Sequence, residues 1–182
     1  MMEDLLILVD ENDNEIDYMD KTPAHVEERL HRAFSVFIYN WHDQKMLIHK
    51  RAEGKYHSGG LWTNACCSHP RKGEETREAT IRRMKQELGL SFTAEEVDEA
   101  HLQELGSFLY YKKFESCAEH EIDHVFYLSI DKENLEFDLD PEEIAEIKWI
   151  SIPELKKWLA EEPESFSAWF PTGFKMVCEK IC

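Results

Sequence analysis

Apolar and polar residues alternate along the chain in runs whose length and spacing predict a succession of strands and helices. A polar turn at residues 41–44 separates two apolar, β-rich runs and therefore predicts a hairpin. The runs that predict strands are residues 5–10, 32–40, 45–52, 62–68, 105–115, 120–130 and 144–150. Segments with helical periodicity interrupt these strands, so the chain is expected to mix both kinds of element.

The clearest helical pattern covers residues 75–88. Ile81, Met84 and Leu88 recur at helical spacing and so share one apolar face. Gly89 follows and supplies the stop, because glycine readily adopts the left-handed conformation that ends helices.

A second helix is expected over residues 22–30, with Thr22 as its N-cap and Pro23 at the first helical position. Two more helices are expected near the C-terminus, over residues 153–162 and 168–180. The order of strands, hairpins and helices predicts an α/β (α+β) fold in which helices flank a mixed β-sheet.

The composition is that of one folded domain. A chain of 182 residues can build a substantial core for one domain but not for two ordinary ones. Hydrophobic residues make up 42% and aromatic residues 12%, whereas a disordered acidic chain would be poor in both.

The formal net charge of −17 at pH 7 argues against nucleic acid and anionic membrane as partners, because both are bound by positive surfaces. An anionic small substrate would require a local cluster of bases. The sequence contains no apolar stretch long enough to span a bilayer and no basic leader of a secretory signal. Together with the odd number of cysteines, these features predict a cytoplasmic protein with reduced thiols.

The adjacent cysteines of "LWTNACCSHP", Cys66 and Cys67, leave three alternatives: a zinc site, a redox pair or a catalytic thiol. Zinc-binding thiolates are usually separated by two to four residues. A redox pair needs two intervening residues, and a disulfide between neighbours would strain the peptide. One cysteine is therefore a candidate for a chemical role, and the other is expected to pack as a structural residue. The remaining thiols are interpreted as buried or incidental: Cys117, Cys178 and Cys182.

Strand alternation sorts the candidate side chains by face. Cys67 and His69 are expected to point together, while Cys66 points to the opposite side. The same rule places Glu119 and Glu121 of "AEHEID" on one face. Each strand therefore presents a pair of side chains that could take part in the same site.

These two pairs could converge on one ion with two N-terminal histidines, His25 and His31. His69 would make a third imidazole, and the two glutamates would add carboxylates. Such a set suits a five- or six-coordinate divalent ion better than a closed tetrahedral zinc site. The alternative is that these residues are scattered over the surface, because side-chain type alone is weak evidence of function.

The segment that begins at Ser68 resembles the Nudix box. The matching residues are its first glutamate, arginine, aliphatic residue, last glutamate, glycine and final aliphatic residue: Glu74, Arg82, Met84, Glu87, Gly89 and Leu90. Ser68 replaces the first glycine, and Arg83 and Gln86 replace two glutamates. In Nudix hydrolases those glutamates gather the metal ions that activate water. The resemblance implies a Nudix fold, a three-layer α/β/α sandwich, that has given up hydrolysis.

Further motifs narrow the resemblance to one family. Six segments resemble type I isopentenyl-diphosphate isomerases in their order and spacing. They are "RLHRAFS", "LWTNACCSHP", "RRMKQELG", "FLYY", "AEHE" and "AWF". The similarity runs from about Leu8 to the C-terminal helix. It implies one domain over residues 1–182, in which residues 1–30 form an extension that contributes metal and diphosphate ligands. The implied reaction is the 1,3-allylic proton shift from isopentenyl diphosphate to dimethylallyl diphosphate in isoprenoid biosynthesis.

The resemblance also implies roles for particular residues. Cys67 matches the catalytic cysteine, and Glu121 matches the glutamate on the other side of the substrate, with Tyr110 as its hydrogen-bond partner. A carbon-carbon double bond that moves by protonation and deprotonation needs an acid and a base on opposite sides. Trp169 matches a tryptophan whose ring face stabilises the carbocation, with core packing as the alternative. Trp62 is interpreted as either structural or part of the pocket wall.

Two metal sites are implied as well. The first, which would hold Mn, Zn or Mg, consists of His25, His31, His69, Glu119 and Glu121. The second would hold magnesium with the substrate diphosphate, through Glu87 and the backbone carbonyl of Cys67. The diphosphate itself would be bound by four bases that match the family: Lys21, Arg51, Lys55 and Arg83.

Two other functions remain as alternatives. A Nudix hydrolase acting on a nucleoside or prenyl diphosphate is disfavoured by the missing glutamates at positions 83 and 86. A noncatalytic metal-binding or regulatory module is disfavoured by the presence of Cys67, Glu121 and the metal-type ligands. The protein is expected to act as a monomer or a weak dimer on a small prenyl diphosphate.

Overall fold

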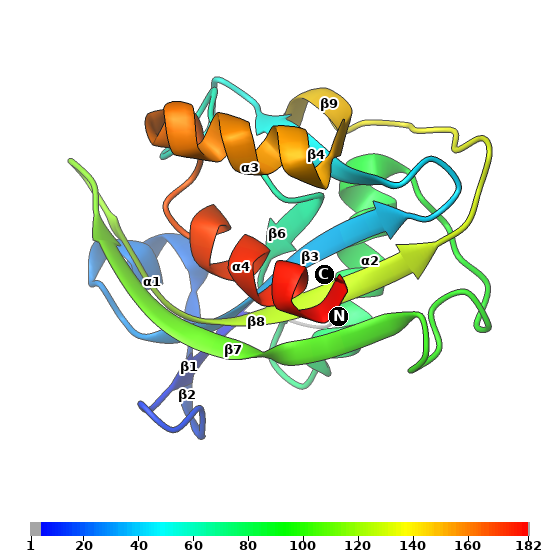
Figure 1. Ribbon diagram of the computed structural model, residues 1–182. Coiled ribbons are helices and arrows are strands. Elements are labelled where there is room, and N and C mark those ends of the chain that lie inside the picture. The colour runs from blue at the N-terminus through cyan, green and yellow to red at the C-terminus, as the bar shows by residue number, and fades with distance from the viewer. Residues whose placement is uncertain (1–4, 182) are drawn as a thin grey trace.

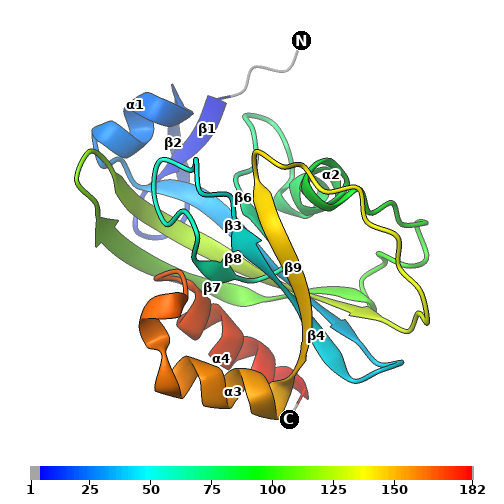
Figure 2. The same cartoon turned by 90° about the horizontal axis from the view of Figure 1, so that it is seen from above.

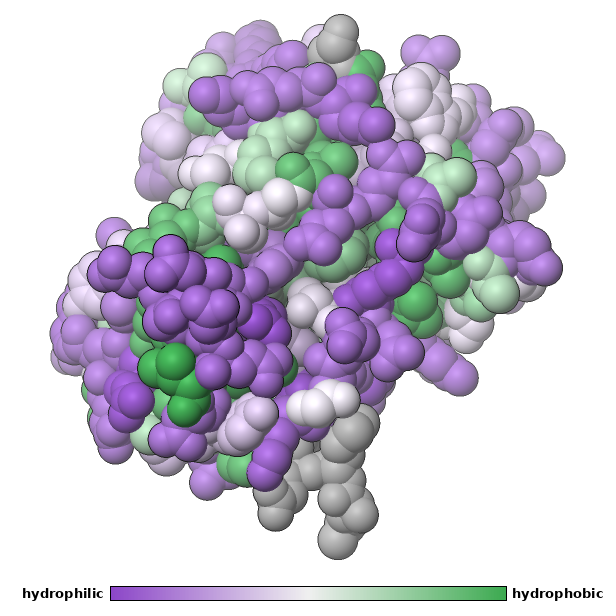
Figure 3. All heavy atoms as spheres, turned by 90° about the horizontal axis from the view of Figure 1, so that it is seen from below, coloured by the Kyte–Doolittle hydropathy of each residue, from purple (hydrophilic) through white to green (hydrophobic). Residues whose placement is uncertain are grey.

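The computed structural model describes residues 5–181 of the chain. The incidental thiol expected at Cys182 lies outside the described residues. Among the residues described, no helix is both long and apolar enough to cross a membrane. Figure 3 shows one face of the molecule, on which hydrophilic side chains surround smaller hydrophobic patches, in keeping with the high net charge.

The fold is organised around β3 (His31–Asn40), the central strand of a mixed sheet (Figure 1). One edge of β3 pairs in parallel with β8 (Ala118–Ile130) along its whole length. The other edge pairs in turn with β1 (Leu5–Val9), β6 (Cys66–Ser68) and β4 (Lys45–Arg51). Because three strands share that edge, residues far apart in the sequence meet beside the first half of β3.

The remaining strands extend the sheet outwards. They are β2 (Glu15–Asp20) beside β1, β7 (Leu102–Lys113) beside β8, and β5 (Trp62–Thr63) and β9 (Ile144–Ser151) beside β4. Within residues 5–181 the sheet has nine strands. The sequence did not predict β2, because the strand is short, rich in acidic residues and mostly exposed. The predicted hairpin at residues 41–44 is confirmed, since Asn40 lies opposite Lys45.

Helices cover both faces of the sheet (Figure 2). They are α2 (Thr76–Leu88) on one face, and α3 (Ile152–Glu161), a 3₁₀ helix (Pro163–Ser165) and α4 (Phe170–Ile181) on the other. Val36 and Ile38 of β3 belong to the core beneath α2, whereas Phe37 belongs to the core beneath α3 and α4. Alternate residues of one strand thus fill two cores, and the predicted three-layer α/β/α sandwich is confirmed.

The predicted helix over residues 75–88 is confirmed as α2, with Met84 and Leu88 fully buried. Gly89 ends the helix in the left-handed conformation, with φ of 71°. A Cβ atom at this position would also lie 2.6 Å from the Cβ of Asp138. Both the backbone conformation and the available space therefore require glycine here.

The N-terminal helix begins and ends earlier than residues 22–30. It is α1 (Lys21–Val26), and Asp20 rather than Thr22 occupies the N-cap position, without a side-chain cap hydrogen bond. Pro23 still lies in the first turn, where its missing N–H costs no helical hydrogen bond.

The early end of α1 is a Schellman-type turn. Arg29 donates its backbone N–H to the carbonyl of Ala24 at 2.9 Å, and Glu28 adopts the left-handed conformation with φ of 57°. The sequence did not reveal this stop, because a glycine usually marks it. The Glu28 carboxylate accepts a hydrogen bond from the Tyr111 hydroxyl at 2.6 Å, which links this turn to β7.

Residues 62–68 form two strands instead of the single strand predicted. β5 pairs with β4, whereas β6 pairs with β3. Between them, the Asn64 side-chain amide donates to the carbonyls of Val36 at 3.2 Å and Cys66 at 2.6 Å. This amide takes the place of a backbone ladder bond, so the chain leaves one neighbouring strand and joins the other.

Candidate active site

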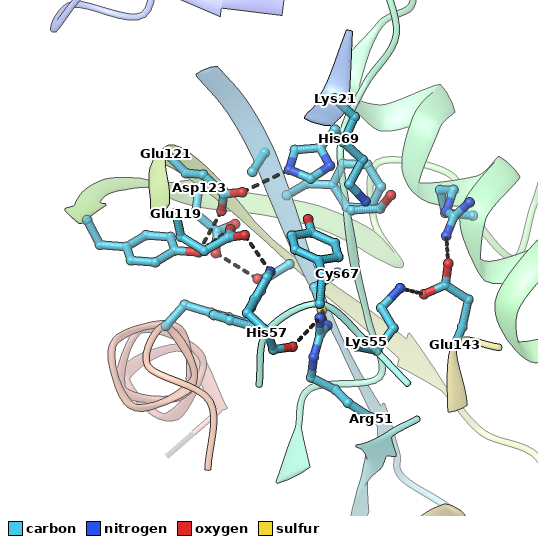
Figure 4. A pocket seen from close by; sticks show the side chains of 18 residues that line it. Lys21, Arg51, Lys55, His57, Cys67, His69, Glu119, Glu121, Asp123 and Glu143 are labelled. Atoms are coloured by element: carbon cyan, nitrogen blue, oxygen red, sulfur yellow. Dashed lines mark hydrogen bonds and ion pairs between the residues drawn. The ribbon is translucent and has the colours of Figure 1, made fainter. Parts of the chain in front are cut away.

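A pocket lies beside the first half of β3, between β6, β8 and the loop that follows β4 (Figure 4). Most of the predicted site residues line it: Lys21, Arg51, Lys55, Cys67, His69, Arg83, Tyr110, Glu119, Glu121 and Trp169. His25 and His31 lie next to His69, with ring centroids 5.5 and 5.0 Å from its ring. Residues from the N-terminal segment, the central sheet and the C-terminal region therefore meet in one place.

The two adjacent cysteines face opposite sides of β6, as strand alternation predicts. Cys66 is fully buried in the core beneath α2, whereas Cys67 lines the pocket. Burial raises the pKa of the Cys67 thiol to about 12, although the nearby Arg51 guanidinium opposes this rise. One Arg51 nitrogen, Nη1, lies 3.7 Å from the sulfur. The pocket therefore holds Cys67 as a protonated thiol beside a cation.

The sheet register brings imidazoles and a carboxylate together. His31 lies directly opposite Glu121, and its Nε2 is 3.2 Å from Oε1 of that carboxylate. His69 Nε2 is 2.8 Å from the same oxygen. His25 completes a group of four residues whose ligand-type atoms lie within 4.8 Å of one another. Burial, reinforced by the charge of Lys21, holds the pKa of His69 well below its usual range.

Glu119, the fifth predicted ligand, lies at the edge of this group, with Oε1 3.2 Å from Nε2 of His25. Three buried atoms here make no hydrogen bond: Nε2 of His25, Nε2 of His31 and Oε1 of Glu119. The other ring nitrogen of each histidine contacts a backbone carbonyl, Lys21 at 2.7 Å and Arg29 at 2.8 Å. That arrangement is typical of metal-ligating histidines, because it fixes which nitrogen is offered. The donor set therefore fits a divalent ion.

The structure distinguishes the two neighbouring tyrosines. Tyr110 lies opposite Glu121 in the sheet, and its hydroxyl donates to that carboxylate at 2.7 Å and to Glu119 at 3.1 Å. Tyr111 instead donates to Glu28 outside the pocket. Burial opposes ionisation of Glu121, but the contact with His31 and the hydrogen bond from Tyr110 keep its pKa below the ordinary value. Glu121 is therefore a carboxylate in the pocket.

The four predicted bases form the local positive cluster that an anionic substrate requires. Burial, with the charge of Lys55 nearby, lowers the pKa of Lys21. Glu143, in the segment just before β9, pairs with Lys55 at 2.5 Å and with Arg83 at 3.2 Å. Two of the bases are thus held in place by one carboxylate.

Glu87 does not line the pocket, in contrast to the residues above. It is buried on α2, where Arg83 Nε donates to its Oε1 at 2.8 Å. Burial raises its pKa, although the charge of Arg83 lowers it. Glu87 therefore lies behind Arg83, one helical turn away, as its spacing predicts.

The two tryptophans differ in their surroundings. Trp169 is buried at the pocket wall, where its Nε1 donates to Oδ1 of Asn64 at 3.2 Å and the Arg51 guanidinium lies 5.3 Å from its ring. Trp62 packs in the core beneath α3, with its ring 5.5 Å from that of Trp158. Of the two alternatives for Trp62, the structure supports the structural one.

The pocket residues that sequence reasoning missed include Asp123, His57 and Glu143. Asp123 follows Glu121 by two positions on the same strand face, so alternation could have identified it. Its Oδ2 accepts a hydrogen bond from Ser35 at 2.7 Å, and burial raises its pKa well above the ordinary value. His57 and Glu143 lie in connecting segments, where no periodicity indicates the direction of a side chain.

Comparisons with known proteins agree with this geometry. Residues 29–170 match the family model described as NUDIX domain. The chain is 43% identical to isopentenyl-diphosphate Delta-isomerase 2 of Aromatoleum aromaticum, over 92% of this chain and 83% of that protein. It is 39% identical to isopentenyl-diphosphate Delta-isomerase of Aliivibrio fischeri, over 97% of this chain and 96% of that protein. Among solved structures, a Deinococcus radiodurans protein superposes with a TM-score of 0.66 at 22% identity, covering 86% of this chain and 89% of that one, and shows the fold alone.

Proposed function

The chain belongs to the isopentenyl-diphosphate Delta-isomerase family, within the NUDIX fold, and we propose that its pocket converts isopentenyl diphosphate to dimethylallyl diphosphate. The observation that carries this assignment is that a protonated thiol, Cys67, and a carboxylate, Glu121, line the same pocket as a cluster of bases. The thiol and the carboxylate can exchange protons with the hydrocarbon part of the substrate. The bases can hold its diphosphate.

The proposed reaction adds one proton to the substrate and removes another. Cys67 donates its proton to the terminal alkene carbon, whose double-bond electrons form the new C–H bond and leave a tertiary carbocation on the neighbouring carbon. Glu121 accepts a proton from the carbon on the other side of that cation, and the released electron pair forms the new double bond. In the reverse reaction the same two residues exchange roles.

Two aromatic residues support this proton transfer in the proposed mechanism. Tyr110 donates to Glu121 at 2.7 Å and thereby orients the carboxylate that accepts the proton. Trp169 supplies a ring face that stabilises positive charge, as the position of the Arg51 guanidinium over it illustrates. Trp169 is only 4% exposed, so little of its ring is open to solvent.

The diphosphate would be bound by bases from three segments of the chain: Lys21 at the start of α1, Arg51 at the end of β4 with Lys55 in the loop that follows, and Arg83 on α2. Phosphate oxygens favour such charged donors, and Arg83 in particular can offer a planar fork. The bases would leave the alkene end of the substrate near Cys67 and Glu121.

A divalent ion, Mn, Zn or Mg, would be held by His25, His31, His69, Glu119 and Glu121. When bound, it supplies positive charge that keeps the Glu121 carboxylate ionised. We also propose that Glu87 and the Cys67 backbone carbonyl take part in binding magnesium with the diphosphate, which suits their hard oxygen donors.

The proposal also covers the domain organisation, the cellular location and the oligomeric state. Residues 1–182 act as one domain, in which residues 1–30 contribute ligands, as the positions of Lys21 and His25 support. We also propose a cytoplasmic location, in keeping with the free thiols of the described cysteines Cys66, Cys67, Cys117 and Cys178. We further propose a monomer or a weak dimer.

The decisive experiment is incubation of the protein with isopentenyl diphosphate in heavy water, followed by NMR. We expect deuterium at the former terminal alkene carbon and formation of dimethylallyl diphosphate. Release of inorganic phosphate without deuterium incorporation would instead support a hydrolase. If the protein contains metal by elemental analysis and yet forms neither dimethylallyl diphosphate nor inorganic phosphate, that result would support a binding module.

Replacing Arg83 by glutamate would restore an acid of the Nudix box, and we expect weaker diphosphate binding rather than hydrolysis. The variant loses a donor and places a third carboxylate beside Glu87 and Glu143. We expect KM for isopentenyl diphosphate to rise by about tenfold or more, since charge-assisted hydrogen bonds contribute about 1.5–3 kcal/mol. Steady-state rates and a phosphate-release assay measure both effects. Robust hydrolysis by Arg83→Glu would show that the role of α2 has been misassigned.

Removal of the metal by a chelator should stop turnover and loosen the N-terminal segment. His25 and His31 belong to that segment and to the start of β3, so a bound ion would link both to β8. We expect faster hydrogen exchange over residues 15–31 after chelation. Acidification below about pH 6 should have the same effect, because protonated imidazoles cannot bind metal. Unchanged exchange and activity in a protein stripped of metal would contradict the site.

A further inference from the structure

His57 is a buried loop residue whose ring meets the carboxylate of Glu119. The residue is 7% exposed, and its Nε2 lies 2.5 Å from Oε1 of Glu119. Connecting segments usually run over the surface, where their polar groups contact water. A buried imidazole in such a segment needs a partner, and Glu119 supplies it.

The surroundings of His57 fix the orientation of its ring. The ring stacks on Phe114 with centroids 4.8 Å apart and meets the edge of Tyr56 at 4.5 Å. Its Nδ1 lies 3.1 Å from the hydroxyl of Ser58, and its carbonyl oxygen accepts a hydrogen bond from Arg51 at 3.4 Å. When the Nε2 nitrogen carries the proton, Nδ1 can accept a hydrogen bond from the Ser58 hydroxyl. Nε2 is the ring nitrogen that contacts the Glu119 carboxylate.

The Glu119 carboxylate has few groups to orient it. Oε2 accepts a hydrogen bond from Tyr110 at 3.1 Å, and Oε1 contacts both His25 at 3.2 Å and His57. His25 belongs to the proposed metal ligands themselves. The Glu119 carboxylate also lies near Glu121, which is another proposed ligand. Among residues 5–181, the side chains that contact this carboxylate and are not proposed metal ligands are Tyr110 and His57.

We propose that His57 is a positioning residue that orients Glu119 for metal binding, an inference that rests on the metal site of the proposed function. Nε2 of His57 lies 2.5 Å from Oε1, an oxygen that makes no hydrogen bond in this structure, while Tyr110 donates to Oε2. These two contacts restrain the carboxylate before the ion arrives. The same contact connects the metal site to the loop that carries Lys55, a base of the diphosphate cluster. Hydrogen-bond partners of metal ligands typically change metal affinity or activity 10–100-fold when they are removed.

The test compares two substitutions that separate the N–H donor from the ring. His57→Phe keeps the stacking surface against Phe114 but removes the donor, whereas His57→Gln removes the ring and keeps an amide N–H at similar reach. Purified protein stripped of metal is titrated with Mn²⁺, and the free ion is measured by electron paramagnetic resonance. This measurement of Mn²⁺ binding does not depend on enzymatic activity. His42→Phe, at a histidine on the surface, is the matched control.

We expect the Kd for Mn²⁺ to rise about tenfold or more in His57→Phe and to stay within about threefold of wild type in His57→Gln. The His42→Phe variant should bind as wild type does. Equal affinity in His57→Phe and wild type would overturn the proposal, and so would equal weakening in both His57 variants, which would assign the effect to the ring. If the wild-type protein fails to bind Mn²⁺, the metal site of the proposed function is wrong, and the proposal for His57 falls with it.

Discussion

Cys67→Ala should abolish isomerisation, whereas Cys66→Ala should retain most of it. Only the Cys67 sulfur lines the pocket, and Cys66 is fully buried in the core beneath α2. Loss of a general acid typically costs about 10²–10⁴ in rate, so we expect kcat for Cys67→Ala to fall by at least about 10². Cys66→Ala should instead lower the free energy of unfolding by about 1 kcal/mol. Initial rates and urea denaturation of both variants measure the two effects.

The comparison of the two cysteines also has an internal control. Both substitutions remove one thiol from the same strand, so any general effect of losing sulfur would appear in both. Metal content should be unchanged in each variant, because neither side chain belongs to the His/Glu group. Equal loss of activity in the two variants, with both folded, would refute the assignment of opposite faces.

The sequence predicted those faces because strand alternation is a local property. A period of two residues requires only that the backbone be extended, and it correctly grouped Cys67 with His69 and Glu119 with Glu121. The same rule extends to Asp123, although the sequence analysis did not apply it there. Local patterns therefore suffice for the direction of side chains on strands.

Two of the errors lie where an unexpected local conformation is accompanied by a side-chain contact with a distant segment. Asn64 breaks the predicted strand over residues 62–68, because its amide bonds two backbone carbonyls. Glu28 ends α1 at a position where glycine is usual, and its carboxylate is held by Tyr111 on a distant strand. Neither effect follows from propensity, because each depends on a partner brought close by the tertiary structure.

The convergence of the site depends on strand pairing, which no local pattern specifies. His31 meets Glu121 only because β3 and β8 run parallel in that register, and Cys67 joins them only because β6 pairs with the other edge of β3. From the sequence, their convergence on one ion was a hypothesis based on side-chain type and strand alternation, and the family resemblance strengthened it. The loop residues His57 and Glu143 were missed because neither periodicity nor the quoted motifs include them.

Glu121→Gln should reduce catalysis by more than its loss of metal explains. The substitution keeps the size of the side chain and one carbonyl oxygen, so part of the metal affinity should remain. It removes the carboxylate that accepts the proton, and the hydrogen bond from Tyr110 cannot restore that capacity. After correction for metal content, we expect kcat to fall by about 10²–10⁴, the typical contribution of a general base.

Glu119→Gln is the matched control for this prediction. Glu119 lies on the same face of β8, contacts the same tyrosine and belongs to the same proposed ligand set, but it has no proposed part in proton transfer. Its activity should therefore fall in proportion to its metal content. Both quantities are measured on the same samples, by elemental analysis and by initial rates with isopentenyl diphosphate. Proportional loss of metal and rate in Glu121→Gln as well would remove its claim to be the base, because a ligand role alone would then account for both residues.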